Sequence, residues 1–126
     1  MMGEENSPWV TFSKEVLHTH VSNDQIVFVD FTADWCLTCK INKQVVLERP
    51  DVMKIFSSKD VILMRADWTN RNEEITQILY SLGRSGVPAY VIFPGGEIDS
   101  PILLPEILTV GSIEDGLMKA ETFSKK

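Results

Sequence analysis

Cys36 and Cys39 are the only cysteines of the chain and are separated by two residues. They follow a nearly continuous run of apolar and β-branched residues at 26–31 and precede a segment with helical character. At a helix start, unpaired backbone N–H groups and the positive end of the helix dipole stabilise a thiolate. The spacing also permits a short, reducible disulfide. We therefore expect a reactive dithiol, with Cys36 as the attacking thiol and Cys39 as the resolving one.

Three other interpretations of this pair remain open at this point. A structural disulfide across so short a loop would constrain little of the chain. A zinc site completed by His18 and His20 would require residues two apart on a helix to face the same way. Two unreactive buried thiols would be unusual at a strand-to-helix junction. Thiol–disulfide exchange is the preferred interpretation, and neither a metal nor another cofactor is expected.

Val87 and Pro88 form the second candidate element. Proline cannot donate a backbone hydrogen bond to a sheet, so its place at the start of an apolar strand is unusual. The sequence Gly86-Val87-Pro88 predicts a cis Val87–Pro88 bond in a tight turn. A trans proline that ends a loop is the alternative.

Asp30 is the third candidate, because it lies inside the apolar run at 26–31. Strand alternation places its side chain on the face of Phe28, within a covered layer. Burial raises the pKa of a carboxyl group, which makes Asp30 a candidate proton acceptor for Cys39. The alternative is a structural aspartate that is hydrogen-bonded at a strand end.

These residues require a frame, and hydrophobic periodicity predicts one. Helices are expected at 10–21 with Ser13 as cap, at 36–48, 50–56, 73–82 and 112–123, and strands at 26–31, 61–66, 89–93 and 102–104. Early alternation of strands and helices, followed by a late hairpin, predicts an α/β domain. We expect a central mixed sheet of four to five strands with helices on both faces. The expected organisation is a flexible segment at 1–9 and a single domain at 10–124.

Composition limits the possible partners. The chain has 126 residues and a net charge of -6, without a Lys/Arg cluster, which argues against a nucleic-acid partner. No apolar run approaches the roughly 20 residues that span a bilayer, and the start lacks a signal peptide. We therefore expect a monomer without direct membrane insertion, either an excised domain or a cytoplasmic protein.

Residues 31–40, with the sequence FTADWCLTCK, resemble the active-site segment of the thioredoxin-like C-terminal domain of DsbD, the membrane thiol:disulfide interchange protein. Further segments similar to that family are 66–70, 83–88 and 103–109. The resemblance implies a thioredoxin fold and a protein-disulfide reductase. Its electrons would come from a dithiol donor, such as a transmembrane domain of the same protein, and pass to oxidised protein thiols at the periplasmic face of a bacterial inner membrane.

The resemblance also implies roles for individual residues. Asp30 would be the buried acid, and Trp35, Val87 and Pro88 would face the substrate. The family commonly has Glu four residues after its second cysteine, whereas this chain has Lys43. If Lys43 faces the cysteines, its charge favours a thiolate; if it points to solvent, it is an ordinary surface lysine.

Two alternative functions remain. One is a free-standing soluble thioredoxin-like reductase, which would fit a cytoplasmic location. The other is a redox-inert thioredoxin-fold module that binds extended peptides through Val87.

Overall fold

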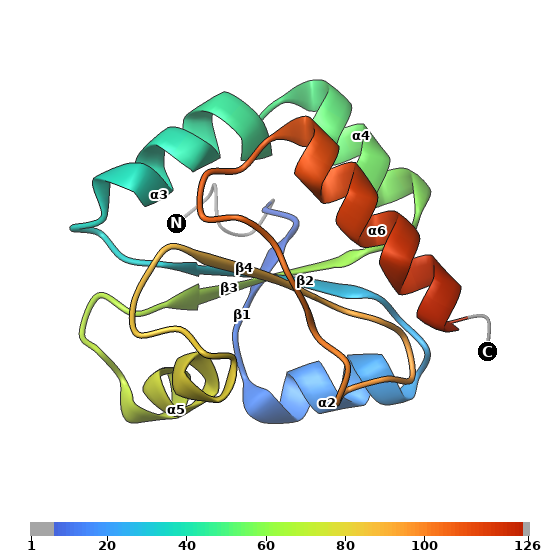
Figure 1. Ribbon diagram of the computed structural model, residues 1–126, viewed down its shortest axis with the longest axis horizontal. Coiled ribbons are helices and arrows are strands. Elements are labelled where there is room, and N and C mark those ends of the chain that lie inside the picture. Colours follow the sequence, from blue (N-terminus) through green and yellow to red (C-terminus); the bar gives the residue numbers. More distant parts are fainter. Residues whose placement is uncertain (1–6, 125–126) are drawn as a thin grey trace.

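A five-stranded mixed sheet with helices on both faces forms the frame of the protein (Figure 1). The computed structural model describes residues 7–124. Its elements are β1 (Trp9–Thr11), α2 (Lys14–Ser22), β2 (Val27–Thr32), α3 (Leu37–Asn42), the π-helix η1 (Lys43–Leu47), α4 (Pro50–Ser58), β3 (Ile62–Asp67), α5 (Glu73–Ser81), β4 (Ala89–Phe93), β5 (Ile102–Leu103) and α6 (Val110–Ser124). The predicted fold class, an α/β domain with a mixed sheet, is confirmed.

β2 lies at the centre of the sheet, whose strand order is β1-β3-β2-β4-β5. β3 runs parallel to both β1 and β2, whereas β4 runs antiparallel to β2 and β5. Every residue of β2 except Thr32 is buried, as its apolar composition predicts for a strand covered on both faces. The carboxyl end of this central strand leads directly into the cysteine motif.

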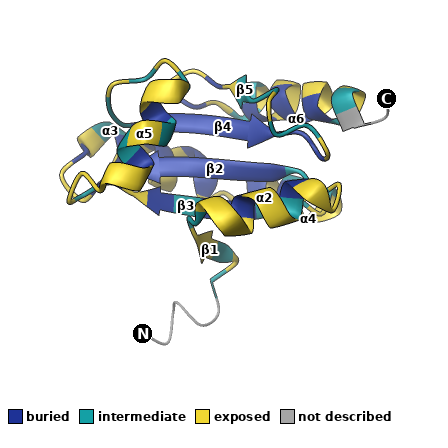
Figure 2. Cartoon of the chain, turned by 90° about the horizontal axis from the view of Figure 1, so that it is seen from below, coloured by how far each residue is buried: buried dark blue, intermediate teal, exposed yellow. Residues whose placement is uncertain are grey.

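Two hydrophobic cores hold the layers together. α2 and α5 cover one face of the sheet, and α3, α4 and α6 cover the other (Figure 1). Seen from the side of α2 and α5, the outer surfaces of these helices are exposed, while β2 and β4 are buried (Figure 2). Aliphatic side chains dominate both cores, with Phe31 and Trp68 among the aromatic residues buried under α2 and α5 and Phe28, Phe56 and Tyr90 buried under α4 and α6.

The start of the domain differs from the prediction. The helix expected at 10–21 begins only at Lys14, with Ser13 as its cap, and Trp9–Thr11 instead forms the edge strand β1. Trp9 was assigned to a flexible segment, but it packs edge-on against Phe28 at a centroid distance of 6.1 Å. A strand of three residues is too short to show strand alternation in a sequence. Residues 1–6 of the expected flexible segment lie outside the described residues.

The helix expected at 36–48 is also divided. α3 ends at Asn42, and the chain continues as η1 up to Leu47. π-helical turns are rare and often occur near functional sites. The final helix begins at Val110 rather than at Ser112, because Thr109 and Ser112 cap it reciprocally through their side chains and backbone N–H groups.

Asn42 ties α3 to the rest of the domain. Its buried amide nitrogen donates to Tyr90 Oη at 2.9 Å and to the carbonyl of Glu106 at 2.8 Å. Its Oδ1 accepts from the backbone N–H of Leu108 at 3.2 Å. These bonds join the helix that carries the cysteines to β4 and to the loop before α6.

We predict that Asn42→Ala lowers the free energy of unfolding by about 2 to 3 kcal/mol, because it leaves several buried polar groups without partners. Urea denaturation measures this loss. Gln44→Ala, which removes an exposed amide from η1, is the matched control and should change stability little. Equal effects of the two substitutions would contradict the role assigned to Asn42.

Candidate active site

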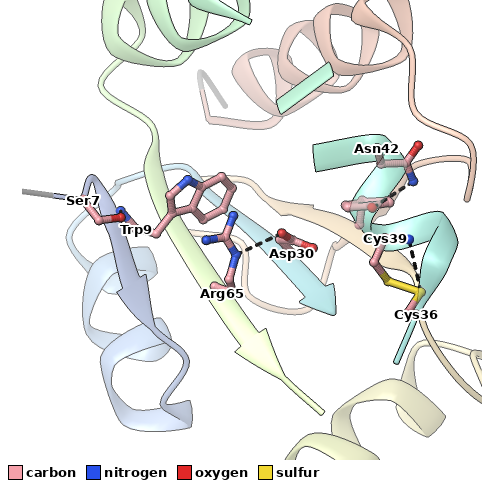
Figure 3. A network of polar contacts seen from close by, with 8 residues as sticks. Ser7, Trp9, Asp30, Cys36, Cys39, Asn42 and Arg65 are labelled. Atoms are coloured by element: carbon pink, nitrogen blue, oxygen red, sulfur yellow. Dashed lines mark hydrogen bonds and ion pairs between the residues drawn. A yellow bond between two sulfur atoms is a disulfide. The ribbon is translucent and has the colours of Figure 1, made fainter. Parts of the chain in front are cut away.

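The cysteine pair forms a disulfide at the carboxyl end of β2 (Figure 3). Cys36 is the N-cap residue of α3, and its Sγ accepts from the backbone N–H of Cys39 at 3.2 Å. The Cα atoms of the two residues are 5.3 Å apart. Cys36 is 6% exposed and Cys39 is 4% exposed, so only a small part of either residue reaches solvent. The helix-start environment expected from the sequence is therefore present.

The Val87–Pro88 segment lies against the cysteines. Its peptide bond is cis, and the half-buried Val87 packs on the cluster formed by Ala33, Cys36 and Cys39. Pro88 is buried directly before β4. The structure thus brings the two motifs together, although they are far apart in the sequence.

Trp35 stands beside the disulfide with 49% of its surface exposed. Its indole Nε1 donates to the carbonyl of Thr69 at 3.1 Å, and the backbone N–H of Asp34 donates to Thr69 Oγ1 at 2.9 Å. Trp35 also packs against Trp68 at a centroid distance of 6.0 Å. The loop after β3 therefore supports the exposed indole next to Cys36.

Asp30 is buried, as predicted, but it is not alone. In the sheet it lies directly opposite Arg65 of β3 and Tyr90 of β4. Arg65 Nε donates to Asp30 Oδ2 at 3.2 Å, and the indole of Trp9 covers the guanidinium at 4.1 Å (Figure 3). Within residues 7–124, Asp30 Oδ1 has no hydrogen-bond partner. One carboxyl oxygen is thus held by Arg65 and the other is available to take a proton.

Burial raises the pKa of Asp30 above its ordinary value of 3.8, and this effect outweighs the opposing charges of Arg65 and Lys43. The pKa of the Tyr90 hydroxyl is also raised, first by burial and then by the charge of Asp30. Both shifts favour the uncharged form. The carboxyl group therefore has the environment of a proton acceptor rather than that of a fixed surface anion.

A cavity of about 180 Å³ lies between Asp30 and Cys39. Asp30, Cys39, Lys43 and Arg65 all line it. Lys43 thus lines the same cavity as Cys39, although its side chain remains exposed. The cavity is large enough for water molecules, which can carry a proton between groups that do not touch.

The zinc alternative is not supported by this arrangement. His18 and His20 belong to α2, on the face of the sheet opposite α3 (Figure 1). His18 is exposed, and His20 Nδ1 lies 2.6 Å from Gln25 Oε1. The cysteines and the histidines thus occupy opposite sides of the sheet.

Sequence reasoning missed the residues that hold Asp30 and α3 in place: Trp9, Asn42, Arg65 and Tyr90. For Arg65 a signal was present, because it is a charged residue inside an otherwise apolar strand, as Asp30 is. Two opposite charges in neighbouring buried strands indicate a pair. The other three have no comparable signal, since aromatic and amide side chains also occur in ordinary strands and helices.

We predict that Asp30→Asn gains stability relative to the unsubstituted protein as pH rises from 4 to 8. The folded state binds the Asp30 proton more tightly than the unfolded chain does. The contribution of protonated Asp30 to the free energy of unfolding is therefore fully present below its ordinary pKa of 3.8. It is lost as pH rises through the raised pKa of the folded state. Asparagine has no such loss.

Thermal melts of both proteins across this pH range measure the difference. Asp34→Asn, which removes an exposed carboxylate near the same strand end, controls for the change in net charge. If the stability of Asp30→Asn relative to the unsubstituted protein falls with rising pH, the attraction of Arg65 outweighs the effect of burial on the pKa of Asp30.

Comparison with known proteins agrees with this geometry. A family profile described as thioredoxin-like matches residues 9–95. The chain is 37% identical over 73 residues to the thiol:disulfide interchange protein DsbD of Pseudomonas fluorescens. The aligned stretch covers 57% of this chain and 12% of that protein. It is 30% identical over 98 residues to DsbD of Escherichia coli, and this aligned stretch covers 78% of this chain and 15% of that protein. The chain thus spans only a small part of these relatives.

Solved structures show the same fold. The oxidised C-terminal domain of DsbD from Neisseria meningitidis has a TM-score of 0.68 at 21% identity, covering 85% of this chain and 99% of that one. Chloroplastic thioredoxin z has a TM-score of 0.65 at 21% identity, covering 89% of this chain and 93% of that one. Together with the Cys36–Cys39 disulfide, the relatives support a thiol–disulfide oxidoreductase. The chain belongs to the thioredoxin-like family.

Proposed function

We propose that this domain is a protein-disulfide reductase that passes electrons through the Cys36–Cys39 pair to oxidised protein thiols. The observation that carries the proposal is the disulfide at the start of α3, packed against Val87 of the cis-proline loop. A reactive cysteine needs a stabilised thiolate and access to the substrate. The N-cap position of Cys36 supplies the first, and the exposed Trp35 next to it marks the surface where a substrate docks.

The chemistry is a pair of thiol–disulfide exchanges. The Cys36 thiolate attacks one sulfur of the substrate disulfide; a bond to Cys36 forms while the substrate bond breaks, and one substrate thiolate leaves. Cys39 then loses its proton and attacks Cys36 Sγ, which releases the second substrate thiolate and leaves the Cys36–Cys39 disulfide. The substrate gains two electrons, and a dithiol donor restores the pair by the reverse exchange.

Asp30 accepts the proton of Cys39 in this proposal. Three observations support it: the two residues line one cavity, Asp30 Oδ1 has no partner within residues 7–124, and burial raises the pKa of the carboxyl group. Lys43 lines the same cavity and lowers the cost of negative charge there. The backbone of Val87 is the proposed pairing site for an extended substrate segment.

The names of the relatives suggest the setting. Both are thiol:disulfide interchange proteins of which this chain matches a small part, so we infer that the domain acts within a larger DsbD-like protein. Its donor would be a dithiol of that protein, and its location the periplasmic face of a bacterial inner membrane. In residues 7–124, no helix combines the length and the apolar character needed to cross a bilayer.

Insulin reduction by dithiothreitol tests the activity, and a redox titration tests its direction. We expect the domain to accelerate insulin reduction and to have a potential between roughly -200 and -270 mV, the range from glutaredoxins to thioredoxin. Absence of activity would favour a peptide-binding module. A potential near that of strong oxidants, about -120 mV, would show that electrons flow in the opposite direction.

We predict that Asp30→Asn slows resolution of the mixed disulfide by about tenfold or more, because it removes the base while keeping the shape. The measurement is turnover of a protein disulfide between pH 6 and pH 8. Lys43→Ala, alone and combined with Asp30→Asn, shows whether the lysine also favours the Cys39 thiolate. Unchanged rates for Asp30→Asn, with and without Lys43→Ala, would reduce Asp30 to a structural residue.

A further inference from the structure

Arg71 lies on the loop after β3 that supports Trp35, the residue before Cys36. Its guanidinium carbon is 4.9 Å from the centre of the Trp35 ring and 5.4 Å from that of Trp68. The residue is exposed, and its backbone has a φ of 53°, in the left-handed region that non-glycine residues seldom adopt. Two indoles and the loop conformation therefore hold this cation next to the residue that precedes Cys36.

The carboxylates nearest to Arg71 in the sequence have other partners. Asp67 Oδ1 accepts from the backbone N–H of Thr69 at 3.0 Å. Glu73 Oε2 accepts from Gln77 Nε2 at 3.3 Å, and Glu74 Oε2 accepts from the backbone N–H of Lys14 at 3.2 Å. Across residues 7–124, Arg71 forms no ion pair.

A guanidinium that stacks on aromatic rings keeps the N–H groups at its edge free. These donors match the two oxygens of a carboxylate, a geometry that lysine does not provide. We propose that Arg71 is a specificity-determining residue that binds a carboxylate of the substrate close to its disulfide.

This inference rests on the proposed function and adds the class of substrate: disulfides flanked by acidic groups. The chain has a net charge of -6, so its long-range field repels such substrates. A cation held against the Trp35 indole offsets that repulsion where the substrate is proposed to dock. Because Trp35 immediately precedes Cys36, an anion held by Arg71 would lie next to the residue that leads into the attacking cysteine.

Three small disulfides of similar length test the inference without any protein docking surface. They are 3,3′-dithiodipropionate with two carboxylates, bis(2-hydroxyethyl) disulfide with no charge, and cystamine with two ammonium groups. The second-order rate constant for oxidation of the reduced domain by each probe is followed through tryptophan fluorescence. The quantity compared between variants is the dicarboxylate rate divided by the neutral rate.

For Arg71→Gln, we expect this ratio to fall by about threefold to tenfold, as for the loss of a partly exposed charged hydrogen bond. The corresponding ratio for cystamine should stay level or rise. Arg71→Lys, which keeps the charge but loses the planar fork, should lie between Arg71→Gln and the unsubstituted protein. Lys54→Gln removes an exposed cation of α4 with the same change in net charge, and its ratio should not change.

An unchanged ratio in Arg71→Gln, or an equal loss of rate with all three probes, would overturn the inference. The second result would mean that Arg71 only supports Trp35. Failure of the unsubstituted domain to react with the uncharged disulfide would instead overturn the proposed function, and the inference with it.

Discussion

The backbone N–H of Cys39 points at Cys36 Sγ because Cys36 caps α3, and the rest of the site depends on that contact. A sulfur in this position faces the unpaired donors of the first helical turn, which favour its thiolate form. The fold places this helix start at the end of the buried central strand, β2. A rigid strand before the motif and the Asn42 hydrogen bonds behind it fix the direction of the helix.

Asp30 shows how the same frame permits an acid inside the core. A buried carboxylate is unfavourable unless it is paired, and Arg65 supplies a partner from the neighbouring strand. The pairing is incomplete, because burial still raises the pKa of Asp30. An acid that is neither fully neutralised nor solvated can take up and release a proton in the cavity that Cys39 also lines. Because the Trp9 indole packs over the guanidinium of Arg65, the environment of Asp30 also depends on the edge strand β1.

Local patterns were sufficient to predict several structural features of the candidate site. The Cys36–Cys39 spacing, the buried strand before it, the cis Val87–Pro88 bond and the burial of Asp30 each follow from a short stretch of sequence. The pairing of Arg65 with Asp30 has a weaker signal, the opposite charges of two apolar strands, because it also depends on the register of residues 35 positions apart. The π-helical turn, the edge strand at Trp9 and the stacking of Arg71 also depend on tertiary contacts.

The central claim is that the start of α3 makes Cys36 the attacking thiol. The most direct test is the rate of iodoacetamide alkylation between pH 5 and pH 9, measured on reduced Cys39→Ser and Cys36→Ser variants, each of which keeps one thiol. We expect Cys36 to react faster at neutral pH, with an apparent pKa below the free value of about 8.5. Equal rates for the two thiols, or faster reaction of Cys39, would contradict the assignment.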